Sequence, residues 1–322
     1  MKLAEAQELG KGGEGVIVAV LDSGVDSSHQ DLRGATVPGH NTVRDGEADD
    51  IDSGPHGTGI ATLIAGRGHG SGDGLLGVAP RSKVMSVTPT EDPALLAKGI
   101  DWAIEHGAKV INMSFGQYSE SDAVRQAIEK AVAADVVLVA AAGNDHKTVA
   151  FPAALPGVLA VGSVDRKNKV ASFSNYGDTL DVVTYGTAMT VARPNNKYEL
   201  VHGTSDSAAL VSGAAALMRA RYPDMSAAEV AERLTGTAVD QGPKGRDDYY
   251  GYGQLDVIAA LTAPRVAPSA TSAAPPTQDE PVAYPPVEKS EGLPPLLFVA
   301  VGVLLLVLCL ALFMIVRARR KS

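Results

Sequence analysis

The chain has 322 residues, 45% of them hydrophobic, and a formal net charge of −9. This length and apolar content allow one core of roughly 250 residues with an appendage, and the acidic balance argues against nucleic acid as a partner. The single cysteine, Cys309, excludes an intramolecular disulfide. We therefore expect one domain of catalytic size.

Residues 1–12 are expected to be a lead-in to this domain. They hold neither the apolar segment nor the cleavage site of a secretory signal peptide, which predicts that the natural start lies upstream. The glycines of residues 10–15 have the G-x-G-x-x-G spacing of a dinucleotide site. Because they precede a strand-like run instead of following one, we interpret them as a loop.

The apolar run 16–21 is typical of a central parallel strand buried on both faces, because it shows no polar alternation. Asp22 follows it directly, and the carboxyl ends of strands are where open α/β sheets build their sites. By itself, Asp22 is weak evidence for a site, because a turn acid at a strand end also explains it. His56 stands among glycines and small residues at the start of a predicted helix, where a close approach is possible.

Three other features are interpreted as ordinary surface structure. The glycine-rich residues 66–74 lack the G-K-[ST] ending of a phosphate-binding loop and are expected to form a flexible connection. The acids of residues 45–52 are expected to form a solvated loop and not a metal site. The remaining histidines, which lack the glycine-rich setting of His56, are His29, His40, His69, His106, His146 and His202.

The middle of the chain alternates predicted helices and strands, which indicates a parallel sheet between layers of helices. The strands are expected over residues 110–116, 136–140 and 158–163, and the first helix over 94–106. A second helix buries one face made by Val124, Ala127, Ile128, Ala131 and Val132. Ser226 and Glu229 form a capping box that predicts a later helix.

Asn144 follows the strand 136–140 and a pair of small residues. A side-chain amide held at the carboxyl end of a strand can donate a hydrogen bond to an anion. Taken alone, Asn144 is better explained as a turn residue after Gly143. Its interpretation therefore depends on the other polar residues at neighbouring strand ends.

Ser205 belongs to a Gly-Thr-Ser turn that opens directly into a predicted helix of small residues. Backbone N–H groups and the dipole at a helix N-terminus favour developing negative charge, so this is a good position for a nucleophile. Serine is also a preferred N-cap, and on this segment alone that explanation is the better one.

The C-terminal part predicts a membrane anchor. Residues 264–295 hold nine of the chain's 19 prolines and are expected to form an extended stalk. Residues Leu296–Val316 carry no charge and match the length of a transmembrane helix. The basic tail 317–322 places the C-terminus in the cytoplasm and the large N-terminal part outside.

Four short motifs occur together in one order: D-S-G-V at 22–25, H-G-T-G-x-A at 56–61, A-A-G-N at 141–144 and G-T-S at 203–205. In this order they resemble the subtilisin-like serine proteases, or subtilases, whose triad runs Asp, His, Ser along the chain. The resemblance covers a peptidase domain over residues 13–263. With the stalk and anchor, the chain most resembles the mycosins, membrane-anchored subtilases associated with type VII secretion.

The resemblance implies a subtilisin-like three-layer fold and a serine endopeptidase that cleaves polypeptides without a cofactor or metal. Ser205 would attack the peptide carbonyl, His56 would take its proton, and Asp22 would orient the imidazole. Asn144 would stabilise the oxyanion together with the Ser205 N–H group. The residues implied to bind substrate are Ser114, Phe115, Gly116, Ala141, Ala142 and Gly143.

The chain departs from the subtilase pattern G-T-S-M-A-x-P, because Asp206, Ser207 and Ala209 occupy the Met, Ala and Pro places. An acid in this position suits the helix dipole; if buried, it would also raise the basicity of His56 or carry a desolvation penalty. An alternative function is a weakly active or inactive subtilase scaffold that stabilises a membrane secretion complex. A further alternative is a tail-anchored protein that faces the cytoplasm.

Overall fold

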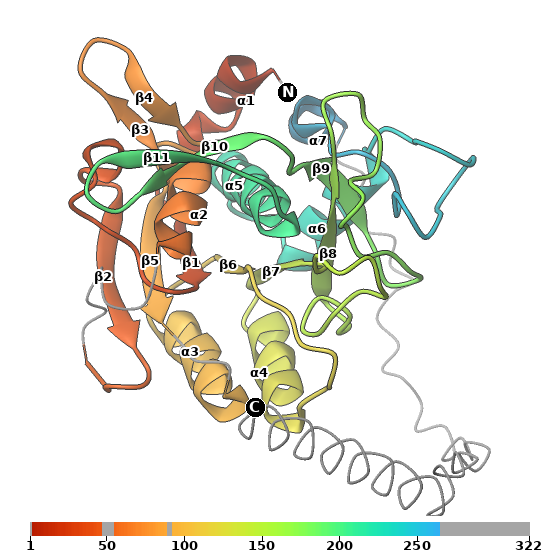
Figure 1. Cartoon of the computed structure of the whole chain (residues 1–322), viewed down its shortest axis with the longest axis horizontal. Helices are drawn as coiled ribbons and strands as arrows, with labels where there is room; N and C mark the ends of the chain where they lie inside the picture. Colours follow the sequence, from red (N-terminus) through yellow and green to blue (C-terminus); the bar gives the residue numbers. More distant parts are fainter. Residues whose placement is uncertain (1, 47–54, 89–91, 265–322) are drawn as a thin grey trace, which may run out of the picture. The chain divides into compact units, whose positions relative to one another are not determined.

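The computed structural model describes residues 2–46, 55–88 and 92–264. Within these ranges the centre is a seven-stranded sheet in which every neighbouring pair is parallel (Figure 1). The predicted α/β class with a parallel central sheet is thereby confirmed. In spatial order the strands are β2 (Thr36–Asn41), β5 (Lys83–Thr88), β1 (Ile17–Leu21), β6 (Val110–Met113), β7 (Val137–Ala141), β8 (Val158–Val164) and β9 (Val182–Tyr185).

Helices cover both faces of this sheet (Figure 1). One face carries α3 (Pro93–Glu105) and α4 (Asp122–Ala133), and the other carries α2 (His56–Ala65) and α5 (Thr204–Arg221). Buried residues of the shorter helices join the core around α5; these helices are α1 (Leu3–Leu9), α6 (Ala227–Gly236) and α7 (Val257–Thr262). Two short 3-10 turns, η1 (Lys11–Gly13) and η2 (Gln30–Leu32), flank β1, and η1 lies in the glycine loop that we predicted.

Strand β1 contributes to both cores, because successive side chains of a strand point to opposite faces. Val18 and Val20 pack on the side of α2 and α5, whereas Ala19 and Leu21 pack on the side of α3 and α4. All four are completely buried. The absence of polar alternation in this run therefore follows from burial on both faces of the sheet.

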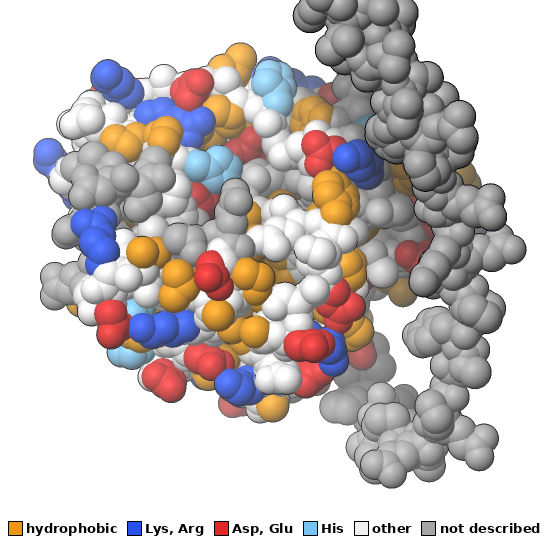
Figure 2. Space-filling model, turned by 60° about the horizontal axis from the view of Figure 1, so that its bottom comes forward, with side chains coloured by type: hydrophobic (Ala, Val, Ile, Leu, Met, Phe, Trp, Pro, Cys, Tyr) orange, Lys and Arg blue, Asp and Glu red, His pale blue; other side chains and the backbone are white. Residues whose placement is uncertain are grey.

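The outer faces of α3 and α4 are solvated and charged. Figure 2 shows the molecule turned so that the bottom of Figure 1 comes forward, and acidic and basic side chains are interspersed on this face. Lys130 of α4 pairs with Asp101 of α3 at 2.9 Å, and exposed pairs of this kind contribute roughly 0–1 kcal/mol. The predicted apolar face of α4 is confirmed except at Val132, which is 47% exposed and lines a cavity.

Helix α5 is buried along nearly its whole length, from Thr204 to Arg219. Such burial all round is typical of a helix inside a core and requires small side chains where neighbours come close. At Gly213, a methyl group would lie 2.6 Å from Val78 Cβ, which is closer than two carbon atoms can pack. The small residues of α5 therefore set how deeply the helix and the Ser205 at its start sit in the fold.

Gly213→Ala is expected to lower the free energy of unfolding by about 1–3 kcal/mol, because the added methyl group overpacks the contact with Val78. Gly236→Ala is the control, since that glycine is also a helical residue, the last of α6, but has no neighbour within 4 Å of the added carbon. We expect this control to gain up to about 1 kcal/mol from helix propensity. Urea unfolding of the full chain, followed by circular dichroism, measures both changes. Equal effects of the two variants would contradict the packing argument.

Residues 66–74 do not form the plain surface connection that we expected. They belong to an antiparallel hairpin of β3 (Arg67–His69) and β4 (Asp73–Leu76). The hairpin is held by buried Asp31, which contacts His69 Nδ1 at 2.6 Å and accepts a hydrogen bond from the Leu75 N–H group. A second hairpin, β10 (Met189–Arg193) with β11 (Lys197–Val201), was not predicted.

The predicted stalk beyond Pro264, the transmembrane helix at 296–316 and the basic tail lie outside the described residues. So do most of the acids in the predicted solvated loop, at 47–54. Across the ranges that are described, no helix has the length and apolar character needed to span a membrane. The same ranges contain no group of three or more His, Cys, Asp or Glu side chains arranged to hold a metal ion.

Candidate active site

Asp22 and His56 form a close pair at the carboxyl edge of the sheet. Asp22 follows the end of β1, and His56 is the first residue of α2. His56 Nδ1 lies 2.9 Å from each carboxylate oxygen of Asp22. The Asp22 side chain is almost fully buried, whereas that of His56 is 44% exposed. The pair thus fixes the ring through Nδ1 and leaves the imidazole open to solvent on another side.

Gly57 makes this approach possible. A methyl group on Gly57 would lie 2.3 Å from the Gly24 carbonyl oxygen and 3.1 Å from Asp22 Cβ. Ser23 Oγ also accepts a hydrogen bond from the Gly57 N–H group at 3.1 Å, which ties the start of α2 to the loop after β1. The glycines around His56 in the sequence therefore serve close packing against Asp22.

The surroundings of His56 favour its protonated form. Burial is the largest single influence and lowers the pKa, but the hydrogen bond and charge of Asp22 raise it, and the charge of Asp206 adds to this effect. The resulting pKa of His56 lies above its ordinary value of 6.5. An imidazole of this kind accepts a proton readily and is stabilised once charged.

Ser205 lies in the first turn of α5 and is 7% exposed. Its Oγ donates to the Ser114 carbonyl oxygen at 3.2 Å. In the part of the chain that the structure describes, no hydrogen bond joins Ser205 Oγ to His56. Hydrogen bonds between nucleophile and base are often long in ligand-free sites and tighten when substrate binds. Helices α2 and α5 pack together, so both residues lie on neighbouring elements.

The side-chain nitrogen of Asn144 and the backbone nitrogen of Ser205 border one small volume. The side-chain oxygen of Asn144 accepts hydrogen bonds from the Thr204 N–H group at 2.9 Å and from Thr204 Oγ1 at 3.0 Å, which fixes the orientation of the amide. A methyl group on Gly203 would lie 3.7 Å from both Asn144 Nδ2 and the Ser205 backbone nitrogen. Because glycine leaves this volume empty, an oxygen atom can approach both donors.

The other predicted substrate residues lie at the ends of β6 and β7. Strand β6 ends at Met113. The strand was expected to run to residue 116, but Ser114, Phe115 and Gly116 lie beyond its end. Ala142 is held in the sheet by its N–H group, which donates to the Val161 carbonyl oxygen. Gly143 has a φ of 111°, and a side chain there would lie 2.3 Å from Asn175 Nδ2. These small residues surround the candidate site without filling it.

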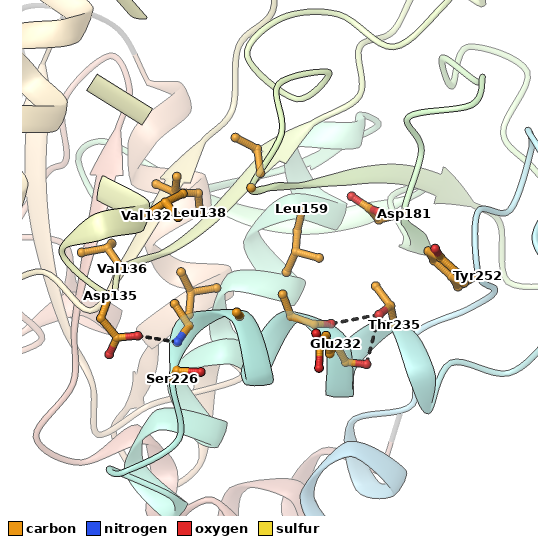
Figure 3. A pocket seen from close by; sticks show the side chains of 16 residues that line it. Val132, Asp135, Val136, Leu138, Leu159, Asp181, Ser226, Glu232, Thr235 and Tyr252 are labelled. Carbon is orange, nitrogen blue, oxygen red and sulfur yellow. Dashed lines mark hydrogen bonds between the residues drawn. The ribbon is translucent and has the colours of Figure 1, made fainter. Parts of the chain in front are cut away.

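A cavity of about 470 Å³ lies elsewhere (Figure 3). It opens between α4, β7, β8 and α6, and Figure 3 shows Val132, Leu138 and Leu159 on its apolar side. Neither the Asp22–His56 pair nor Ser205 lines it. The cavity is therefore separate from the candidate site.

Two contributors to the site were missed at the sequence level. The Gly-Thr-Ser motif points to Ser205 as its functional residue, but Thr204 also contributes, because it orients Asn144 through two hydrogen bonds. Arg193 of β10 reaches the start of α2, where Nη1 donates to the Pro55 carbonyl oxygen at 3.1 Å. No motif marked Arg193, because it enters the site from a hairpin that was not predicted.

These features are typical of serine hydrolases: a buried acid that orients a histidine, a serine at the start of a buried helix, and two nitrogen donors that border one small volume. Comparison with known proteins identifies the family within this class. The model of the subtilase family, peptidase S8, matches residues 13–253. The chain belongs to the subtilase family.

Three known proteins show how far the similarity extends. Subtilisin DY of Bacillus licheniformis is 38% identical over 270 residues, which cover 81% of this chain and 96% of that protein. The subtilisin of Bacillus pumilus is 40% identical over 263 residues, covering 77% and 91%. The crystal structure of MycP1 with its N-terminal propeptide removed matches with a TM-score of 0.74 and 30% identity, covering 82% of this chain and 95% of that chain.

These matches confirm the resemblance predicted from the motifs, including the similarity to a mycosin. The chain is a subtilisin-like serine endopeptidase, and its substrates are polypeptides.

Proposed function

We propose that the chain hydrolyses peptide bonds through Asp22, His56 and Ser205. The observation that carries this proposal is the Asp22–His56 pair, with both carboxylate oxygens 2.9 Å from Nδ1. That contact keeps the proton on Nδ1, so Nε2 is the nitrogen that can accept the Ser205 proton. Ser205 Oγ then forms the acyl bond, and His56 returns the proton to the leaving amine.

Asn144 Nδ2 and the Ser205 N–H group would hold the negative oxygen of the tetrahedral intermediate. Support comes from the fixed amide of Asn144 and the empty volume beside Gly203. Substrate would lie along Ser114, Phe115 and Gly116 as an added strand, with its side chain before the cut near Ala141–Gly143.

We further propose that this peptidase domain, residues 13–263, is anchored by the segment 296–316 with its catalytic side outside the cytoplasm, and that it works with secretion-machinery proteins of a type VII system. The support is the uncharged run followed by a basic tail and the similarity to MycP1. Protease accessibility in intact cells tests this orientation. Protection of the domain from added protease would contradict it.

A fluorophosphonate probe tests the proposed nucleophile. We expect the full-length protein, purified in detergent, to be labelled, and the label to be lost in Ser205→Ala. Ser207→Ala is the matched control, because Ser207 lies in the same buried turn but its Oγ donates to the Thr184 carbonyl oxygen. Labelling that persists in Ser205→Ala would refute the assignment, as would a label lost equally in both variants.

The alternative function, a scaffold with little proteolysis, makes a different prediction for the same variant. If Ser205→Ala restores secretion in cells that lack the wild-type protein, the scaffold function is favoured. If secretion needs Ser205, peptide hydrolysis is the required activity.

A further inference from the structure

Asp206 is a buried carboxyl group that the proposed triad does not use. It lies in the first turn of α5, directly after Ser205, and is only 4% exposed. In the part of the chain that the structure describes, no hydrogen bond or ion pair engages its carboxyl group. Burying a carboxyl group without a partner is costly, so its position needs an explanation.

The Asp206 carboxyl faces the volume where the oxyanion would form. A methyl group on Gly203 would lie 3.8 Å from Asp206 Oδ2, and 3.7 Å from both Asn144 Nδ2 and the Ser205 nitrogen. The nitrogen atoms of two potential donors and one carboxyl oxygen therefore lie within 4 Å of one point. An ionised carboxylate there opposes a negative oxygen, whereas a neutral carboxyl group can donate a hydrogen bond to it.

Burial raises the pKa of Asp206 to about 7, although His56 and Arg193 act in the opposite direction. These are the charged or titratable groups that act on it, His56 from α2 and Arg193 from β10, and Arg193 is itself paired with Glu199 of β11. Asp22 is paired with His56 Nδ1. The N-terminus of α5 favours the ionised form of Asp206. Asp206 is therefore neutral below and ionised above a pH near neutrality.

We propose that protonated Asp206 is a third donor of the oxyanion hole, and that its ionisation suppresses hydrolysis. This inference rests on the proposed catalytic role of Ser205. When Ser205 Oγ bonds to the peptide carbonyl carbon, its proton passes to His56 Nε2 and the C=O π electrons move to the oxygen. The Asp206 O–H group donates a hydrogen bond to that oxygen and keeps its proton.

The proposal predicts a bell-shaped pH dependence of kcat/KM. Activity rises with pH as His56 loses its proton and becomes a base, and falls as Asp206 loses its own proton above a pH of about 7. Without a titrating group beside the oxyanion, the second decrease would be absent.

Two variants separate charge from hydrogen bonding in an assay with an internally quenched peptide between pH 5 and 10. Asp206→Asn keeps an N–H donor without a charge, so we expect the decrease above pH 7 to disappear. Asp206→Ala removes both the charge and the hydrogen-bond donor. The decrease therefore also disappears, but kcat at pH 6 falls about 10²-fold below that of Asp206→Asn. At pH 9 both variants are expected to exceed the wild-type protein.

A decrease above pH 7 that persists in Asp206→Asn would overturn the proposal, and so would equal kcat values for the two variants at pH 6. Ser205→Ala is measured alongside: hydrolysis surviving in that variant refutes the proposed nucleophile, whereas an inactive Ser205→Ala with an unaltered Asp206→Asn profile refutes only the role of Asp206.

The inhibition constant of a peptide aldehyde, whose hemiacetal carries the same oxyanion, provides a second readout in the wild-type protein. It is expected to weaken above pH 7, and an affinity that does not change with pH would contradict the proposal.

Discussion

Replacing Ser205 by alanine is expected to lower kcat for peptide hydrolysis about 10⁶-fold, the size of loss that removal of a triad serine causes in subtilisin. The expected KM stays close to that of the wild-type protein, because alanine removes only the Oγ atom and its hydrogen bond to the Ser114 carbonyl oxygen and leaves the proposed substrate segment 114–116 in place. The measurement is steady-state hydrolysis of a quenched peptide by the full-length protein.

The control for this loss is again Ser207→Ala, whose hydroxyl group is buried against the Thr184 carbonyl oxygen. We expect its kcat to stay within about tenfold of wild type, because a single net hydrogen bond contributes roughly 1 kcal/mol. A Ser205→Ala variant that retains more than a small fraction of wild-type kcat would exclude Ser205 as the nucleophile. Thermal unfolding of both variants confirms that the comparison concerns folded protein.

Asp22→Asn is expected to lower kcat about 10⁴-fold. The carboxylate places both oxygens 2.9 Å from His56 Nδ1 and so holds the proton there. An amide can instead donate its own N–H group to that nitrogen, which shifts the proton to Nε2 and leaves His56 unable to accept from Ser205. The highest kcat that each protein reaches between pH 5 and 10 measures the loss, because this comparison does not depend on a shift of the pH optimum between the two proteins.

Asp26→Asn provides a matched control, because Asp26 is a buried acid in the same loop but bonds Ser28 and the Asn195 N–H group instead of His56. It is expected to lower stability and to leave kcat within about tenfold of wild type. Equal losses of kcat in the two variants would show that Asp22 acts through the stability of the loop and not through the imidazole.

The sequence predicted the central elements well, because short-range patterns of apolar and capping residues indicate which segments are buried. The uninterrupted apolar run before Asp22 forms β1, buried in two cores, and Ser226 with Glu229 forms the predicted capping box of α6. Motif order also placed Asp22 and His56, which the fold brings into contact from positions 34 residues apart.

Features that depend on tertiary contacts were not predictable in the same way. The hairpin β3–β4 is held by the buried Asp31 carboxylate, which comes from a segment far away in the sequence. Strand β6 ends at Met113, and Gln117, four residues further on, pairs with Phe151 from a distant part of the sequence. Likewise, the sequence showed an acid at position 206, but only the fold shows that its side chain is buried and that one carboxyl oxygen borders the volume beside Gly203.

The most direct test of the central claim, that Asp22, His56 and Ser205 act as one unit, is the kcat of the double variant His56→Ala/Ser205→Ala beside its two single variants. Groups that act in one proton-transfer sequence are strongly non-additive, since removing either one already stops the sequence. We therefore predict the same kcat, about 10⁶-fold below wild type, for both single variants and the double variant. Losses that multiply in the double variant, or a single variant that keeps most of its kcat, would contradict the account.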